Sequence, residues 1–139
     1  AAKAEATSRR ADLLRRQLQH EPGRGGVIVL PFPPAELSGH NSGHWRDHNK
    51  LVATLRAEAF HIARKALRES GYVAPATGDI PLHVRFVPPD NRGDRWNFMQ
   101  RAKCQIDGVA EAMNVNDRRF LPICAYAAPE KPGRVEIRV

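Results

Sequence analysis

The stretch from Pro88 to Phe120, PPDNRGDRWNFMQRAKCQIDGVAEAMNVNDRRF, joins an acidic loop, a helix and a second acidic turn. Its apolar residues recur at three- and four-residue steps, which predicts one buried stripe on an α-helix. The stripe consists of Met99, Ala102, Ile106, Val109, Ala110 and Met113. The other side carries Gln100, Arg101, Lys103, Asp107 and Glu111. Because Lys103, Asp107 and Glu111 follow one another at four-residue intervals, we expect them to line up along one polar face.

The two acidic loops allow more than one interpretation. Asp94 lies three residues before Asn97, so its carboxylate can simply cap the helix by accepting backbone N–H bonds. Asp117 follows Asn116 in a sequence that is typical of turns. Lys103 and Asp107 can form an ordinary solvated ion pair. Alternatively, the carboxylates at the two ends of the helix form a metal site, which requires both loops to fold over the same edge of a sheet.

The flanking sequence predicts strands and one further helix. Residues 27–30 form a short apolar run that ends at two Pro-containing steps, and residues 47–70 carry a helical stripe followed by Gly71. That stripe is Leu51, Leu55, Ala59, Ile62 and Ala66. Alternating apolar residues predict strands around residues 82–86 and 135–139, and residues 120–126 form another strand, which Pro122 places at an edge or a bulge. The predicted order is (helix)-β-α-β-α-β-β, a single small α/β (α+β) domain with a mixed sheet and helices packed on it.

Composition limits the kind of protein. The 139 residues suffice for about one domain, which we place at residues 26–139, after a basic arm or short helix at residues 1–25. The net charge of +7 and the isoelectric point near 10.1 favour a polyanionic partner such as nucleic acid, although a protein can also be merely basic. The two cysteines show no metal-binding spacing, which fits a reducing cytoplasm. The sequence indicates neither a membrane span nor a signal peptide.

A glycine-punctuated loop is predicted at residues 38–46. His40, His44 and His48 are four residues apart and would form a metal-binding face on a helix, but two glycines argue against a helix there. We therefore expect a basic and aromatic loop, His44-Trp45-Arg46, that contacts a backbone phosphate.

Several of these segments together resemble the RusA family of Holliday junction resolvases, especially the forms found in phages and prophages. The resemblance covers roughly residues 27–139, and its most specific parts are Asp94-Arg95-Trp96-Asn97, Lys103, the run from Ile106 to Ala112, and Asn116-Asp117-Arg118-Arg119-Phe120. Proteins of this family are homodimeric, magnesium-dependent endonucleases of small α/β fold that cut four-way DNA junctions in recombination and repair. By this resemblance Asp94 matches the first metal-site aspartate, Asp117 the catalytic aspartate and Lys103 the essential lysine. The chain departs from the family at Trp96, where a second aspartate is usual, and at Asn116, where a carboxylate is usual.

The resemblance predicts a magnesium-dependent endonuclease, with manganese as a possible substitute, that acts on branched DNA as a homodimer. Asp94 and Asp117 are expected to hold the ion and Lys103 to stabilise charge on the phosphate, with no small-molecule cofactor. The residues expected to contact DNA are His44, Trp45, Arg46, Arg92, Arg95, Arg101, Arg118 and Arg119. The two departures leave open an alternative, a module that binds branched DNA without cleaving it. A third interpretation, docking on an acidic protein, has no motif behind it.

Overall fold

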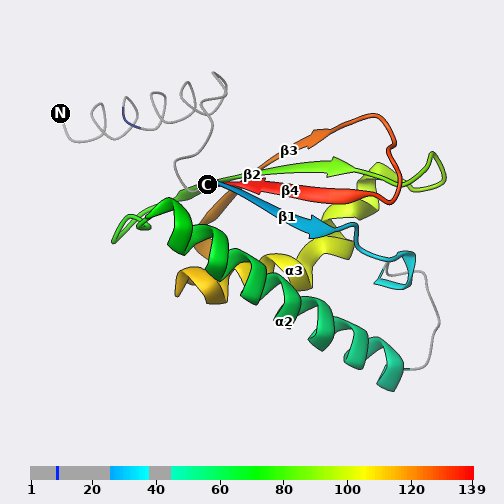
Figure 1. Cartoon of the computed structure of the whole chain (residues 1–139), viewed down its shortest axis with the longest axis horizontal. Helices are drawn as coiled ribbons and strands as arrows, with labels where there is room; N and C mark the ends of the chain where they lie inside the picture. Colours follow the sequence, from blue (N-terminus) through cyan, green and yellow to red (C-terminus); the bar gives the residue numbers. More distant parts are fainter. Residues whose placement is uncertain (1–8, 10–25, 38–44) are drawn as a thin grey trace.

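The computed structural model describes residue 9 and residues 26–37 and 45–139 (Figure 1). Its elements are β1 (Val27–Pro31), the 3₁₀ helix η1 (Ala35–Leu37), α2 (Trp45–Ser70), β2 (Ile80–Val87), the 3₁₀ helix η2 (Arg95–Asn97), α3 (Phe98–Met113), the 3₁₀ helix η3 (Asp117–Arg119), β3 (Phe120–Tyr126) and β4 (Arg134–Arg138). From β1 onward this is the predicted order. The predicted arm at residues 1–25 lies, apart from residue 9, outside the described residues.

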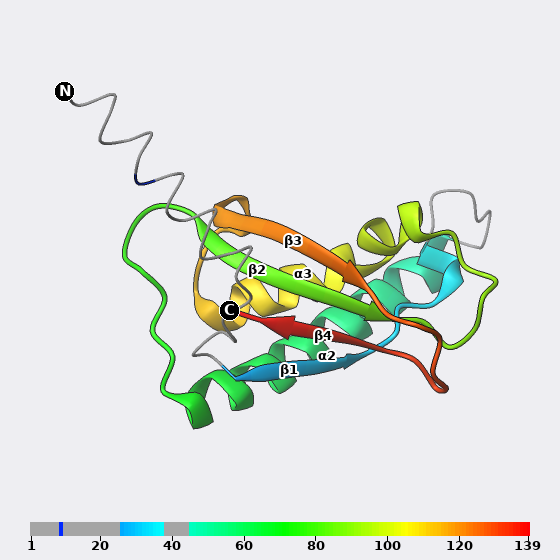
Figure 2. The same ribbon diagram turned by 90° about the horizontal axis from the view of Figure 1, so that it is seen from above.

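The four strands form one mixed sheet in the order β1-β4-β2-β3 (Figure 2). β4 is antiparallel to both β1 and β2, whereas β3 runs parallel to β2. Two parallel neighbours need a crossover connection, and α3 provides it between β2 and β3. β3 lies at the edge of the sheet, as Pro122 predicted, because a proline cannot donate to a second neighbouring strand.

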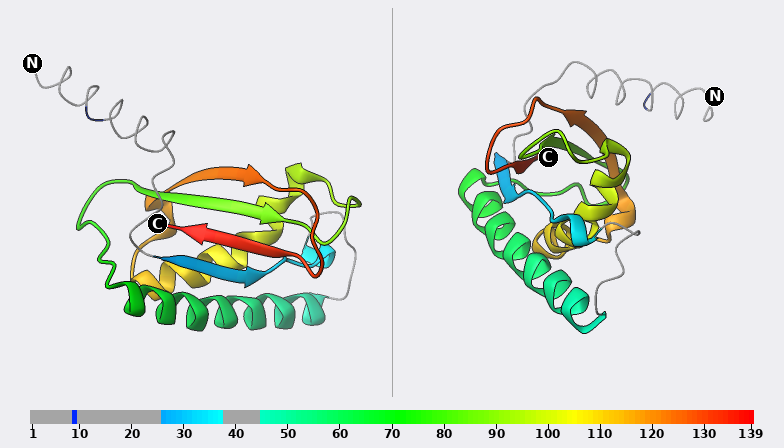
Figure 3. Two further views of the ribbon diagram at one scale, coloured as in Figure 1. Left: turned by 45° about the horizontal axis from the view of Figure 1, so that its top comes forward. Right: turned by 90° about the vertical axis from the view of Figure 1, so that its right-hand side faces the viewer.

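Both long helices cover the same face of the sheet (Figure 3). Alternate residues of the strands point into this layer, which is the period-2 pattern of a half-buried sheet. The fully buried strand residues that follow this pattern are Ile28, Leu30, Ile80, Leu82, Val84, Phe86, Val135 and Ile137, and Val87 at the end of β2 is fully buried as well. The prediction of an α+β domain with helices packed on a mixed sheet is therefore confirmed.

α2 differs in two respects from the prediction. It begins at Trp45 rather than at residue 47, so Arg46 belongs to the first helical turn and not to a loop. Its buried positions are Leu55, Ala59, Ala63 and Leu67, and the last two were not in the predicted stripe. The stripe is rotated because α2 packs beside α3 as well as on the sheet. No described helix combines the length and the hydrophobicity needed to cross a membrane.

Gly108 fixes the distance between α2 and α3. A Cβ atom at this position would lie 2.4 Å from the carbonyl oxygen of Arg56 in α2. One turn further along α3, Glu111 accepts a hydrogen bond of 3.2 Å from Arg56 Nε. Close backbone packing and this ion pair together hold α3 in a defined position against α2.

The strand residues that do not face the helices form a charged cluster at Glu136. Its carboxylate accepts from Arg134 Nε at 2.8 Å, Arg85 Nη1 at 3.1 Å and Arg138 Nη1 at 3.5 Å. Burial raises the pKa of Glu136. The hydrogen bonds and charges of Arg134 and Arg85 together lower it by more, so the pKa lies below its ordinary value. Glu136 is therefore ionised at neutral pH and neutralises part of the charge of three neighbouring arginines.

Candidate functional site

Lys103, Asp107 and Asp117 form a compact cluster on the surface, called here the Lys103 cluster. Lys103 Nζ donates to Asp107 Oδ1 and to Asp117 Oδ2, each at 2.5 Å. The two acceptor oxygens therefore lie no more than twice that distance apart. The Lys103 side chain is 58% exposed and those of Asp107 and Asp117 are 31% and 38% exposed, so solvent and a large ligand can reach all three.

Local sequence explains how Asp117 reaches the helix. Asn114 ends α3 in a left-handed conformation with φ of 54°, and its N–H bonds back to the carbonyls of Ala110 and Glu111. The Asn116 side chain then accepts from Arg118 N at 3.0 Å and caps η3. These two turns direct Asp117, the first residue of η3, back toward the polar face of α3.

Lys103 and Asp117 each stabilise the charged form of the other. Hydrogen bonds to Asp107 and Asp117 raise the pKa of Lys103, although partial burial opposes them. The hydrogen bond from Lys103 lowers the pKa of Asp117. Lys103 is therefore charged and Asp117 ionised at neutral pH, and the ammonium group donates to both Asp107 and Asp117.

Asp94 lies in a different environment. Its Oδ1 accepts from Trp96 N at 3.0 Å, so Asp94 caps the short helix η2 that leads into α3. The interpretation of Asp94 as a helix cap is confirmed, but the helix that it caps is η2 and not α3. The carboxylate also lines a surface hollow of about 320 Å³, the Asp94 hollow, together with Asp90, Arg95, Trp96 and Ala127.

The structure does not bring Asp94 and Asp117 together within one chain. Asp94 follows the carboxyl end of β2, whereas Asp117 precedes the amino end of β3, and these two strands are parallel. Their register covers six residue steps from Ile80 to Phe86, so the two strand ends lie about 20 Å apart at roughly 3.3 Å per residue. The two loops lie at opposite ends of the parallel strands β2 and β3. They do not fold over the same end of the sheet, as a metal site shared by Asp94 and Asp117 in one chain would require. In the part of the chain that the structure describes, no three His, Cys, Asp or Glu residues are arranged to hold a metal ion.

The residues expected to contact DNA differ in their exposure. Arg46, Arg92, Arg95 and Arg118 are exposed. Arg119 is half-buried, and its guanidinium donates to the carbonyls of Gly78 and Pro75, so it holds the loop before β2. His44 lies outside the described residues, and Trp45 is described only as the first residue of α2.

Arg101 was wrongly assigned to the exposed side of the helix. It is 8% exposed, and its Nη2 donates to the carbonyl oxygen of Pro33 at 2.6 Å. The guanidinium lies 5.1 Å from the ring centre of Phe32 and 5.5 Å from that of Phe98. The correction has a physical reason: the chain after β1 folds over this flank of α3 and supplies both a carbonyl acceptor and aromatic faces for the cation.

Trp96 is the most exposed large apolar residue of the described chain, at 91%. It stands on η2 beside Arg95, whose guanidinium lies 6.0 Å from the ring centre of Tyr126. A tryptophan that packs against nothing offers both faces of its indole to a partner, and nucleobases stack on such surfaces.

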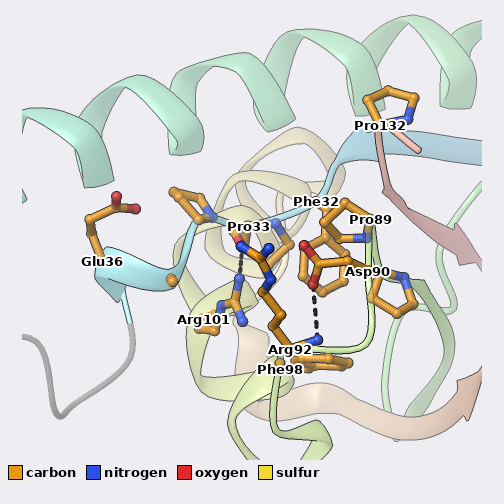
Figure 4. Close-up of a pocket in the computed structure, with 13 residues that line it drawn as sticks. Phe32, Pro33, Glu36, Pro89, Asp90, Arg92, Phe98, Arg101 and Pro132 are labelled. Carbon is orange, nitrogen blue, oxygen red and sulfur yellow. Dashed lines mark hydrogen bonds between the residues drawn. The ribbon is translucent and has the colours of Figure 1, made fainter. Parts of the chain in front are cut away.

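A pocket that the sequence analysis did not foresee lies beside α3 (Figure 4). Its volume is about 420 Å³, and two Pro-Pro steps, Pro33-Pro34 and Pro88-Pro89, form much of its wall. These steps follow β1 and β2. Both strands are antiparallel to β4, so they run in the same direction and their carboxyl ends lie at the same end of the sheet. That repeated pattern, a strand followed by Pro-Pro, was the available sequence signal. We call this the proline pocket.

Comparison with known proteins relates the chain to a bacterial protein. No protein-family model matches the chain. The chain is 36% identical over 95 residues to an uncharacterized protein of Xylella fastidiosa (strain Temecula1), an alignment that covers 68% of this chain and 61% of that protein. The chain thus spans less than two thirds of the length of the relative it matches.

Proposed function

We propose that this protein is a divalent-metal-dependent endonuclease that acts on branched DNA, with magnesium or manganese as the metal, in the reducing cytoplasm. The observation that carries the proposal is the Lys103 cluster, two carboxylates and an ammonium group on the surface of a chain with a net charge of +7. Exposed carboxylates in so basic a protein are suited to a cation, and the surrounding arginines to a polyanion.

The donor set fits magnesium, which prefers hard oxygen ligands and commonly uses one or two carboxylates together with substrate phosphate oxygens. Asp107 and Asp117 would provide these carboxylates. Bound there, the ion would polarise the scissile phosphate and lower the pKa of an attacking water. Lys103 would then release its carboxylates and donate to a phosphate oxygen, which stabilises the charge that develops during cleavage.

Asp94 takes part in the same chemistry only if it meets the Lys103 cluster from a second copy of the chain. The loops that carry Asp94 and Asp117 follow and precede opposite ends of the β2–β3 pair, so a two-fold homodimer could place Asp94 of one protomer beside Asp117 of its partner and generate two equal sites. Two sites related by such an axis suit the two symmetric cuts that a four-way junction requires.

A second candidate function is binding of branched DNA without cleavage. It is favoured by Trp96, whose exposed indole occupies the position of a carboxylate in the resembled family, and by the use of Asp94 as a helix cap. The exposed indole offers a surface for DNA and supplies no metal ligand, and Asp94 Oδ1 is occupied by its cap hydrogen bond.

The test is nicking of a synthetic four-way junction in the presence of magnesium, with binding measured on the same samples. We expect wild type to nick the junction, and Asp117→Asn and Lys103→Met to bind but not cleave it. Glu58→Gln, which removes a charge from the exposed side of α2, is the matched control and should behave as wild type. Binding should weaken steeply with salt, because each phosphate contact releases counterions. Equal nicking by wild type and Asp117→Asn would refute the assignment, and binding without nicking by wild type would establish the second function.

A further inference from the structure

The proline pocket contains a buried cation whose hydrogen-bonding capacity is largely unused. The Arg101 side chain is more than nine-tenths buried and borders the pocket. A guanidinium has five N–H donors, and here the carbonyl of Pro33 accepts one hydrogen bond while the buried Nε has no partner. A buried donor without a partner destabilises the protein, so a ligand that accepts a hydrogen bond from it removes that cost.

A second cation faces the same space. Arg92 also lines the pocket, and in Figure 4 its side chain runs from the loop after β2 toward Pro33, where Arg101 is bonded. Neither guanidinium forms an ion pair with a carboxylate within the described residues. Two like charges that converge without a counterion repel one another, and an anion placed between them relieves the repulsion.

Two carboxylates at the rim must be weighed against this. Glu36 and Asp90 also line the pocket, and in Figure 4 the Glu36 carboxylate stands apart from both guanidinium groups. Asp90 Oδ1 is already engaged, because it accepts from Arg92 N at 3.0 Å. Burial lowers the pKa of Arg101, while the charges of Glu36 and Asp90 raise it, so these carboxylates help to keep the buried cation charged. They support Arg101 from a distance and leave its donors available.

We propose that the proline pocket binds a phosphate group of a nucleotide, with Arg101 and Arg92 donating to its oxygens and the proline and Phe32 walls contacting the attached sugar. Arginine suits this role because its planar fork matches two phosphate oxygens. A volume of about 420 Å³ exceeds the needs of a phosphate ion and leaves room for the sugar.

The inference rests on the proposed function, to which it adds a position for the substrate strand. The proline pocket shares Pro88, Asp90, Gly93 and Phe98 with the Asp94 hollow, so the two are adjacent. A strand whose phosphate is held by Arg101 therefore passes beside Asp94 and Trp96. The pocket fixes the register of the strand and has no part in the chemistry of cleavage.

The experiment is a titration of the full chain, labelled with ¹⁵N-arginine, followed by NMR at the Arg101 Nε–Hε signal. This signal should be resolved because the group is buried, and it is assigned by its loss in Arg101→Lys. The probes are dimethyl phosphate, a diester, and thymidine 5′-monophosphate, a monoester, each compared with sodium chloride at equal ionic strength. We expect a saturable shift of the Arg101 signal with phosphate and none with chloride. A shift with the diester identifies an internal phosphate of a strand as the natural ligand, whereas a shift with the monoester alone identifies a terminal phosphate.

Arg92→Gln keeps the test independent of folding, because Arg92 is exposed and its loss should not unfold the chain. It should weaken phosphate binding about tenfold or more, the effect of one charge-assisted hydrogen bond. Arg68→Gln removes an equal charge at the end of α2 and should bind phosphate as wild type does. An Arg101 signal that ignores phosphate, or equal affinity in wild type and Arg92→Gln, overturns the proposal. The titration does not measure cleavage, so its result is separate from the test of the endonuclease. A chain that cleaves junctions but shows no Arg101 shift refutes only phosphate binding in the proline pocket. A chain that shows the shift but does not cleave junctions refutes only the endonuclease.

Discussion

Mixing two inactive variants tests whether the active site is shared between two protomers. All ligand atoms of one magnesium ion lie 2.0–2.1 Å from it, so two ligand oxygens are at most about 4 Å apart. In one chain the ends of β2 and β3 that carry Asp94 and Asp117 are separated by about 20 Å. If both carboxylates serve one ion, they must come from different protomers.

The expected magnitude follows from counting sites. Asp94→Asn and Asp117→Asn homodimers each lack one carboxylate in both sites and should not nick a junction. A heterodimer of the two variants combines both defects in one site and leaves the other site intact. Purified through two different affinity tags, it should therefore nick at about half the wild-type rate per dimer and cut one strand without its symmetric partner.

The matched control is a heterodimer of Lys103→Met and Asp117→Asn. Lys103 and Asp117 belong to the same cluster, so each protomer carries a damaged cluster and no intact site can form. This heterodimer should remain inactive. If the Asp94→Asn and Asp117→Asn heterodimer is also inactive, although it is folded and binds junctions, the shared site does not exist. A monomer in light scattering would exclude it as well.

Three further changes test packing, charge and binding. Gly108→Ala should lower the free energy of unfolding by about 1–3 kcal/mol in a thermal melt, because the 2.4 Å approach to the Arg56 carbonyl outweighs the higher helix propensity of alanine. Glu136→Gln should lower it by about 1–3 kcal/mol at neutral pH, because Arg85 and its neighbours lose their counterion. The pKa of Glu136 in the folded state is below its ordinary value of 4.5. In wild type, the stabilisation by the Glu136 carboxylate is therefore fully present above pH 4.5 and is lost as the pH falls through the folded-state pKa. Denaturation measured against pH should show the stabilities of wild type and Glu136→Gln converging in acid. Trp96→Ala should weaken junction binding in fluorescence anisotropy about five- to hundredfold while leaving the melting temperature unchanged, since the indole is 91% exposed.

The sequence predicted the layers of the fold well because each strand and helix carries its own hydrophobic period. Leu82, Val84 and Phe86 alternate along β2 and are all buried, as a half-buried strand requires. Pro122 correctly indicated an edge strand, since its position excludes a neighbour on one side. Such features depend on residues close in sequence, and local pattern is sufficient to find them.

Arg101 shows where local pattern fails. Two polar residues one turn apart on α3, Arg101 and Gln105, donate to the carbonyls of Pro33 and Pro31, which are 68 and 74 residues away in sequence. A helical period cannot show that a distant backbone segment covers one flank with acceptors. Charged residues are seldom buried, so the sequence alone favours an exposed position for Arg101.

The candidate site was predictable in part. The four-residue spacing of Lys103 and Asp107 predicted their ion pair, which the structure contains. Asp117 joined them because two asparagine-based turns redirect the chain after α3, and its sequence indicated a turn without its direction. Asp94 is separated from Asp117 because α3, with 16 residues, runs along the sheet from the carboxyl end of β2 toward the amino end of β3.

The three surface features around α3 form a continuous path, and this gives Asp94 a second possible relation to the Lys103 cluster. The proline pocket borders the Asp94 hollow on one side, and on the other Arg101 also lines a smaller hollow beside Lys103 and Asp107. Lys103 lies five residues into α3, about 8 Å along the helix from Phe98, which borders the Asp94 hollow. Within a single chain, Asp94 and Trp96 would then meet the strand a short distance from the Lys103 cluster, and the phosphate held by Arg101 would lie between them. This arrangement needs no partner protomer, and it predicts that Asp94→Asn changes where the junction is cut while Asp117→Asn abolishes cutting. The Asp94→Asn homodimer decides between the two, because it should be inactive if the site is shared across the two-fold axis and should still cut, at a changed position, if each chain carries a complete site.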